Sequence, residues 1–216
     1  SHPSSRSAPM FAEGSRGKEV RVTAKSSLVI WRGRFKYNRA ADFDALWDQR
    51  PKEKQYIRIM GKRVAIPRRQ GLYAEDVNSV SGYRYSGETL PSRSICDSPV
   101  VARALDCVRQ LVGDDVADGS GIGGLYNAVF VNWYDDGDKM GLHSDDESGL
   151  NRRRPIFSVT LQPRGPPRIF RIKLNPSHGK GVRLLGQSHG GKRVDIAMQD
   201  GDVMAMAGGF QRELKH

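Results

Sequence analysis

The chain has 216 residues, enough for one domain with its own core, and 38% of them are hydrophobic, which is ordinary for a globular protein. No apolar run approaches the ~18 residues that a membrane span requires, so we expect no membrane partner. A net charge of +11 and a pI of about 9.9 favour an anionic partner, most simply nucleic acid held through its phosphates, although charge alone also fits an ordinary basic protein.

The two cysteines, Cys96 and Cys107, have neither the spacing of a zinc site nor that of a disulfide framework. We expect free thiols in a reducing, intracellular compartment. The sequence does not distinguish nucleus, cytoplasm and organelle.

The first 25 residues are rich in Ser, Arg, Gly and Pro and have no apolar periodicity. They are predicted to form a disordered basic tail, which leaves residues 26–216 as a single domain. A short apolar run at 28–30 indicates the first strand of that domain. Residues 40–49 have apolar side chains at helical spacing, which predicts an amphipathic helix that is capped near Asn38 and ends before Pro51.

Residues 56–66 are typical of a β-hairpin, with strands at 56–60 and 64–66 and a basic tip at 61–63. Such a tip is ordinarily a solvated turn. Tyr73, Tyr83 and Tyr85 follow and interleave with the basic residues, and the last two share one strand face. Stacking on a base is worth ~1–3 kcal/mol per ring, but a face packed on the core explains the same pattern.

Ser98 and Pro99 begin a second predicted helix, as N-cap and first helical residue, and Gly113 ends it. The glycines of residues 119–124 lack the spacing of a dinucleotide-binding loop. We therefore interpret that stretch as a flexible connection.

An apolar strand at 128–131 and an Asp-Asp-Gly turn at 135–137 lead to His143 and Asp145. Residues i and i+2 of an extended segment point to the same face, so this imidazole and this carboxylate can meet at one point. One further His would complete the two-His-one-carboxylate triad of non-haem Fe(II) oxygenases. An isolated His-x-Asp is common in solvated loops, so the third ligand decides the interpretation.

Further strands are predicted at 156–161, 168–174, 194–198 and 202–207, the last two paired around Asp200-Gly201. His178 and His189 compete with His216 for the third ligand position. Both lie in Gly-rich loop sequence without an adjacent strand, so His216 is favoured. A helical first part followed by many short strands predicts a mainly β, α+β domain, a double-stranded β-helix or jelly roll with flanking helices.

Several spaced motifs together resemble the AlkB family of Fe(II)/2-oxoglutarate-dependent dioxygenases. They are Asn132-x-Tyr134, His143-x-Asp145-Asp146-Glu147, Pro155-Ile156, Gly201-Asp202-Val203 and the distant His216. A second block is similar to the segment that lines the base pocket in the animal DNA-repair members, namely Pro67 to Tyr73 and Tyr83 to Gly87. The resemblance covers about residues 55–216.

The resemblance implies a nucleotide-recognition portion at 55–113 and a jelly-roll core at 125–216. It implies Fe(II) bound by His143, Asp145 and His216, which are also the catalytic residues, and 2-oxoglutarate hydrogen-bonded by Asn132 and Tyr134. The residues that it implies for substrate binding are Met60, Arg68, Arg69, Tyr83, Tyr85, Ser86, Asp146 and Glu147. Among these, Met60 or its neighbour Ile59 is expected to insert beside the target base, the arginines to hold phosphates, and the two acids to meet the base.

The implied activity is oxidative demethylation of N-alkylated bases in DNA or RNA, with 2-oxoglutarate and dioxygen as co-substrates and formaldehyde as a product. The resemblance does not distinguish DNA from RNA or identify the lesion.

The family has two arginines on a strand after the last His, one of which binds the distal carboxylate of 2-oxoglutarate. The sequence ends at His216, so we expect the jelly roll to lack its last strand; Arg212 and residues 152–154 are the nearest substitutes. The alternative function is a non-catalytic AlkB-like nucleic-acid-binding or structural subunit with protein partners in a larger assembly. The complete set of metal ligands favours the enzyme.

Overall fold

The computed structural model describes residues 11, 15–79, 84–85, 88–112, 126–147, 150–152, 154–177, 181–185 and 193–216. Predictions for Tyr83, Ser86, Gly113, His178 and His189 lie outside these residues, as do those for the first ten residues and for 119–124. Of Tyr85 the backbone alone is described.

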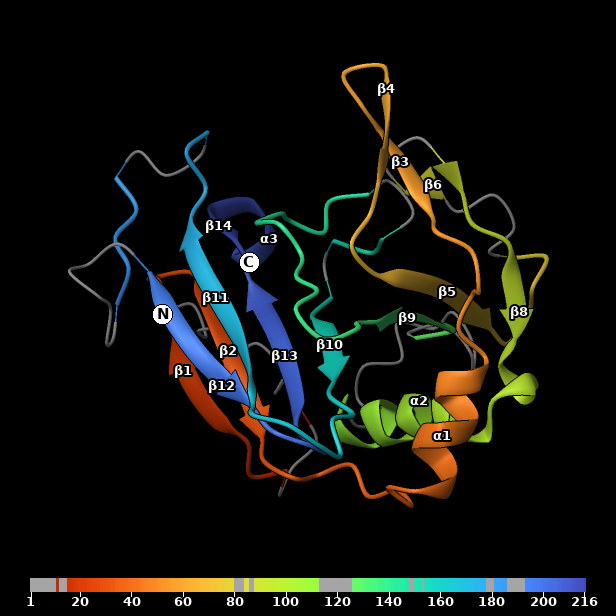
Figure 1. Ribbon diagram of the computed structural model, residues 1–216. Helices are drawn as coiled ribbons and strands as arrows, with labels where there is room; N and C mark the ends of the chain where they lie inside the picture. The colour runs from red at the N-terminus through yellow and green to blue at the C-terminus, as the bar shows by residue number, and fades with distance from the viewer. Residues whose placement is uncertain are drawn as a thin grey trace.

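The largest sheet of the described chain is antiparallel and combines strands from residues 18–31 with strands from residues 156–208. In spatial order its strands are β1 (Lys18–Arg21), β2 (Ser26–Trp31), β13 (Val203–Gly208) and β10 (Ile156–Val159). A second antiparallel sheet lies against it, with the order β12 (Val194–Met198), β11 (Arg168–Leu174) and β14 (Leu214–Lys215). Figure 1 shows these two sheets packed as layers, which confirms the predicted jelly roll.

The central strand β13 is apolar at almost every position because both faces of its sheet are covered. Met204 and Met206 point into a core cluster shared with the smaller sheet, which includes Ile172 and Leu214. The alternate residues, such as Val203, point to the opposite face and a second cluster. Since successive side chains of a strand point to opposite faces, a run without polar residues is what a doubly covered strand requires.

Helices cover the second face. They are α1 (Ala41–Asp48), η1 (Ile95–Asp97) and α2 (Pro99–Val112), while the four-residue α3 (Phe210–Glu213) joins β13 to β14. The two predicted helices are thus confirmed, and Figure 1 shows α1 and α2 together at the lower right of the view. In the described parts of the chain, no helix is both long and apolar enough to cross a membrane.

The predicted caps differ in how they form. The Asn38 side chain accepts hydrogen bonds from the N–H groups of Ala40 and Ala41, both at 3.1 Å, as a cap should. The Ser98 hydroxyl is buried and has no hydrogen-bond partner among the described residues. The backbone carbonyl of Ser98 accepts from the first turn of α2 instead, so the position was predicted correctly and the capping side chain was not.

A third set of strands leads into the segment that carries His143 and Asp145. Its members are the mixed sheet β8 (Ser92–Ser94), β5 (Arg69–Ala74) and β9 (Ala128–Trp133), the hairpin β3 (Tyr56–Ile59) and β4 (Lys62–Ala65), and the pair β6 (Arg84–Tyr85) and β7 (Glu88–Thr89). The hairpin projects from the rest of the molecule in Figure 1. Trp133 attaches this layer to α1, because its indole N–H donates to the carbonyl oxygen of Leu46 at 2.9 Å.

Two predicted boundaries were wrong. Residues 18–25 are not part of a disordered tail, because β1 pairs with β2 along its whole length and Val22 and Thr23 are fully buried. The jelly roll is not confined to 125–216, because β2 lies beside β13 in its central sheet. A four-residue strand is too short to show periodicity, so β1 is formed by its partner rather than by a local pattern.

The Asp200-Gly201 turn does not close the predicted hairpin. Strand β12 pairs with β11 and strand β13 with β10 and β2, so the turn carries the chain from one sheet to the other. The Asp200 carboxylate accepts from the backbone N–H of Gln162 at 2.8 Å, and the Asp202 carboxylate accepts from that of Gly33 at 2.9 Å. These bonds to distant loops fix the point where the chain crosses from one sheet to the other. The sequence alone had indicated a hairpin turn there.

The tip of the β3–β4 hairpin also differs from its prediction. Ile59 pairs with Lys62, so the two turn residues are Met60 and Gly61, with φ of 48° and 78°. Positive φ at both central residues is typical of the type I′ turn, whose twist matches that of the flanking strands. Lys62 and Arg63 therefore lie on β4 and not at the tip.

We predict that Gly208→Ala destabilises the protein far more than Gly137→Ala. Both glycines have positive φ, 72° and 84°, but a Cβ at Gly208 would lie 2.1 Å from the carbonyl oxygen of Lys25, whereas nothing lies within 4 Å of one at Gly137. Gly137→Ala should cost about 1–2 kcal/mol for the left-handed backbone. Gly208→Ala should cost at least ~3 kcal/mol, because the turn before β2 must also move. Chemical denaturation measures both, and equal losses would contradict the close approach of the two turns.

Candidate metal centre

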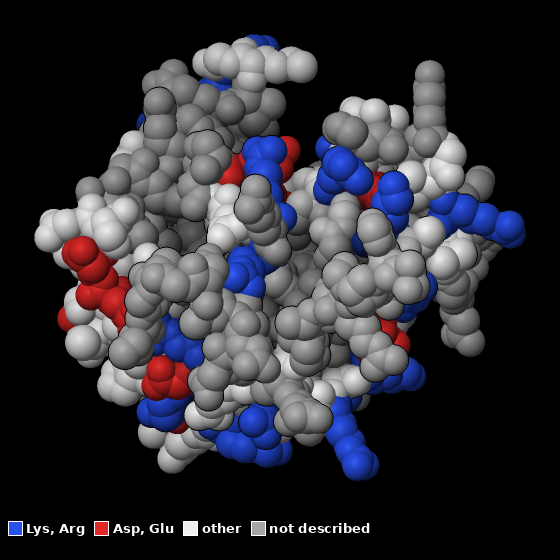
Figure 2. Space-filling model, turned by 180° about the vertical axis from the view of Figure 1, so that it is seen from behind, with Lys and Arg blue, Asp and Glu red and all other residues white. Residues whose placement is uncertain are grey.

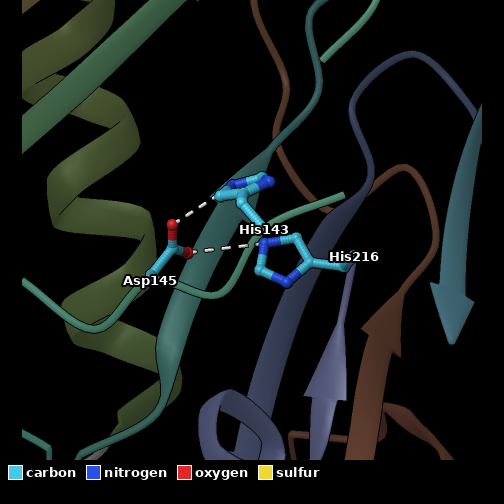
Figure 3. A group of neighbouring side chains, drawn as sticks. All are labelled: His143, Asp145 and His216. Carbon is cyan, nitrogen blue, oxygen red and sulfur yellow. Dashed lines mark ion pairs between the residues drawn. The ribbon is translucent and has the colours of Figure 1, made fainter. Parts of the chain in front are cut away.

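Three side chains from two distant segments converge at one point. His143 and Asp145 lie on the irregular segment after β9, and His216 directly follows β14. The Asp145 carboxylate lies beside both rings, with Oδ1 3.3 Å from His143 Nε2 and Oδ2 3.5 Å from His216 Nε2 (Figure 3). One ligand atom from each residue lies within 4.8 Å of the other two. The structure thus brings together the predicted triad.

Main-chain hydrogen bonds hold the two segments together. The N–H of His143 donates to the carbonyl oxygen of His216 at 2.9 Å, and the N–H of His216 donates back to the carbonyl oxygen of His143 at 2.8 Å. This is the reciprocal pair of an antiparallel ladder, although neither residue belongs to a strand there. The Ser144 hydroxyl adds a bond to the carbonyl oxygen of Leu214 at 2.8 Å.

Each imidazole has a distinct environment. His143 Nδ1 lies 3.0 Å from the carbonyl oxygen of Gly141, which selects the tautomer with a proton on Nδ1 and leaves Nε2 as the metal ligand. The His216 side chain is only 6% exposed and its ring stacks on Phe170 with centroids 5.1 Å apart. His216 Nδ1 is buried without a hydrogen-bond partner among the described residues.

The Asp145 carboxylate is held in its ionised form. Burial by itself raises the pKa of this carboxyl, but its contacts with the His143 and His216 imidazoles outweigh that effect, so the pKa lies well below its ordinary value. An ionised carboxylate beside two imidazole nitrogens is a donor set that Fe(II) accepts, with three positions left for co-substrates. The residues present therefore fit the metal that the sequence implied.

The helix α3 anchors His216 to the beginning of the chain. The buried Glu213 carboxylate accepts from the Thr23 hydroxyl at 2.6 Å and the Ser26 hydroxyl at 2.7 Å, and the N–H of Gly209 donates to the carbonyl oxygen of Lys25 at 2.8 Å. Sequence reasoning missed this support because Thr23 and Lys25 fell in the predicted tail. No local sequence pattern connects Thr23 with Glu213, which are 190 residues apart.

The residues predicted to bind 2-oxoglutarate lie where β9 leads toward the metal ligands. Asn132 is on β9, and its Oδ1 accepts from Arg68 Nε at 2.9 Å. Tyr134 directly follows β9, and the Arg168 guanidinium lies 4.2 Å from its ring centroid. These placements are compatible with co-substrate binding, which stays a prediction.

The residues predicted to bind substrate divide by exposure. Met60 is 99% exposed, whereas Arg68 is 4% exposed, so Arg68 lacks the open position that a phosphate contact needs and supports Asn132 instead. Arg69 is partly buried, with NH1 3.9 Å from Asp135. Among the acids after the His-x-Asp motif, Asp146 is exposed and Glu147 is half-buried. Burial, together with the nearby Asp145 and Asp146 charges, raises the pKa of Glu147.

A family model described as the 2OG-Fe(II) oxygenase superfamily matches residues 35–216. The chain belongs to this superfamily. Its cofactor is therefore Fe(II), with 2-oxoglutarate and dioxygen as co-substrates, and the His143-Asp145-His216 cluster is compatible with that chemistry. No curated protein sequence matches the chain.

We predict that His143→Ala or Asp145→Ala abolishes tight binding of one divalent metal ion. Removing either residue leaves a two-ligand site, so the loss should exceed the ~10- to 100-fold typical of changes in the surrounding shell. The matched control is Asp146→Ala, which removes an exposed carboxylate next to the site. Anaerobic calorimetric titration with Mn(II) measures all three, and undiminished binding in both ligand variants would disprove the assignment.

We predict that the stabilising effect of Glu213 depends on pH. Burial raises its pKa, but the hydrogen bonds from the Thr23 and Ser26 hydroxyls lower it more, so the folded pKa lies below its ordinary value. A lowered folded pKa gives stability that is present above the unfolded pKa, ~4.3, and is lost as the pH falls through the folded pKa. Glu213→Gln should cost about 1–3 kcal/mol at pH 7 and much less in acid.

Urea denaturation between pH 3 and pH 7 measures this difference. Glu19→Gln on β1 is the control, because that glutamate is exposed and its ion pair with Arg21 is long, at 3.8 Å. An equal loss for Glu213→Gln at both ends of the range would show that the carboxylate charge is not what stabilises α3.

Proposed function

We propose that this oxygenase belongs to the AlkB family and demethylates N-alkylated bases in DNA or RNA. The observation that carries the proposal is an exposed apolar side chain at the strained tip of a basic hairpin that leads into β5, the strand paired with β9. Arg69, at the start of β5, pairs with Trp133, at the end of β9. The chain therefore enters the β5–β9 ladder from the hairpin, and leaves it toward His143, at the same end of the ladder.

The hairpin tip has the properties of a wedge between bases. Met60 is fully solvated and adopts φ of 48°, a left-handed conformation that is uncommon for a residue other than Gly. Backbone strain of this kind concentrates at functional sites and supports a functional hypothesis. Apolar wedges compensate for unstacking when a base is flipped into an active site, and Val64, 41% exposed on β4, adds apolar surface beside the tip.

The charge around the hairpin suits a polyanion. Lys62 and Arg63 are exposed on β4, and the Arg63 guanidinium lies 3.9 Å from the ring centroid of Tyr56. Figure 2 shows Lys and Arg in several groups over the face seen from behind, with fewer acidic side chains. Together with the net charge of +11, this supports binding through phosphates with release of counterions.

The acids beyond the metal ligands suit an alkylated base. An N-methylated ring often carries positive charge, and the Asp146 and Glu147 carboxylates could meet that charge or accept from an exocyclic amine. The bound metal with 2-oxoglutarate and dioxygen supplies the oxidising chemistry, while the protein orients the base and excludes water. Hydroxylation of an N-methyl group gives a hemiaminal that breaks down to formaldehyde and the unmethylated base.

The direct test supplies the protein with Fe(II), 2-oxoglutarate and oligonucleotides of DNA and RNA that carry single N-methylated bases, and measures formaldehyde and succinate. Formaldehyde in amounts equal to the base restored supports the proposal. Tight binding of the oligonucleotides without formaldehyde, with metal bound, would favour the non-catalytic nucleic-acid-binding subunit. Succinate release with some other hydroxylated product would show that the protein is an active oxygenase with a different class of substrate.

We predict that Met60→Ala lowers activity on a methylated base in a duplex by about 10-fold or more and changes activity on a single strand by less than threefold. A base in a single strand needs no wedge, because it is already unpaired, whereas a base in a duplex must be unpaired and unstacked at a cost of a few kcal/mol. The control is Ile169→Ala on β11, which removes an exposed apolar side chain of similar size away from the hairpin. Equal losses on both substrates would contradict the wedge.

A further inference from the structure

Gln211 lies on α3 and contacts the metal centre without being one of its ligands. Its side-chain oxygen Oε1 accepts a hydrogen bond from the backbone N–H of Asp145 at 2.9 Å, and its Nε2 lies 3.4 Å from the sulfur of Met206 on β13. We propose that Gln211 is a positioning residue that fixes the direction of the Asp145 carboxylate toward the metal.

Asp145 needs such support because its own segment has no regular structure. Residues 141–147 form neither helix nor strand. The backbone of His143 is held by His216, and the Ser144 side chain is held by Leu214, but the backbone N–H of Asp145 is bound by Gln211. The peptide planes on either side of a residue set the direction of its Cα–Cβ bond and therefore the direction of its side-chain carboxylate. Rotation of the 144–145 peptide would therefore move both oxygens away from the two rings that they face in Figure 3.

Gln211 can fix another residue because α3 is itself fixed. At the start of α3, the N–H of Gly209 is bound to the carbonyl oxygen of Lys25. At its end, the Glu213 carboxylate is bound to the Thr23 and Ser26 hydroxyls. The backbone carbonyl of Glu213 also accepts from the N–H of Asn175 at 2.8 Å. The same four-residue helix thus supports His216 through the chain and Asp145 through the Gln211 side chain.

An amide is well suited to this role. Its oxygen accepts the N–H bond of Asp145 while its nitrogen contacts the Met206 sulfur, so both ends of the amide are held. Residues that orient a ligand in this way typically contribute 10- to 100-fold to metal affinity, because a misdirected ligand must reorganise before it binds. The effect should appear in the affinity and ligand field of the metal rather than in the global stability of the apo-protein.

The experiment compares Gln211→Met, which keeps the length of the side chain and removes the acceptor, with Gln211→Glu, which keeps an acceptor oxygen. Arg212→Gln is the control, because Arg212 is exposed on the same helix. Each protein is titrated anaerobically with Mn(II), its Co(II) absorption spectrum is recorded, and exchange of the Asp145 backbone N–H is followed by NMR in the apo form. None of these measurements requires nucleic acid, so their outcome is separate from that of the proposed demethylation.

For Gln211→Met we expect Mn(II) affinity to fall by at least about 10-fold, an altered Co(II) spectrum and loss of exchange protection at Asp145. Gln211→Glu should restore the protection and bring affinity within about threefold of the parent, and Arg212→Gln should change nothing. Parental Mn(II) affinity and Co(II) spectrum in Gln211→Met would overturn the proposal. So would equal metal loss in the Met and Glu variants together with a lowered melting temperature, since that pattern describes a helix that has merely come loose.

Discussion

The pair of main-chain hydrogen bonds between His143 and His216 is the constraint on which the site depends. It joins the irregular segment after β9 to the end of the chain after β14, and it places both histidines with their rings beside one carboxylate. Because the bonds are made by backbone groups, any residue type except proline would form them. What the side chains add is chemistry: two imidazole nitrogens and an ionised carboxylate at a distance that one metal ion can span.

That pair can form because two layers of sheet fix the chain on either side of it. Strand β13 is buried on both faces, between the helices and the smaller sheet, and α3 then turns the chain back into β14 beside β11. The turn before β2 is bound to both ends of α3, so residues near the beginning of the chain determine where its last residues lie. Support for the metal centre therefore comes from the sheet core rather than from the segment that carries the ligands.

The hairpin differs from this core in its exposure and in its backbone conformation. Its tip residue Met60 is solvated and strained, and β4 is exposed along its whole length. The buried Arg68 shows that a basic residue next to the hairpin is not automatically part of a nucleic-acid surface, since its guanidinium serves Asn132. A rigid oxygenase centre with a projecting, basic, apolar-tipped hairpin is the combination that the proposed base demethylation uses.

The sequence by itself determined the jelly-roll class, the helices α1 and α2, most of the strands and the three candidate metal ligands. The helices and strands depend on periodicity and turn residues, and His143 and Asp145 on the His-x-Asp motif, all of which are local. His216 was favoured by its adjacent strand and by the family resemblance. Tertiary structure decided that β1 exists, that Asp200-Gly201 crosses between sheets, that Met60 and Gly61 form the hairpin tip, and that Gln211 and Glu213 support the site. Each of these depends on a hydrogen bond or strand pairing whose partner the local pattern does not identify, and the burial of such partners is known only once the chain is folded.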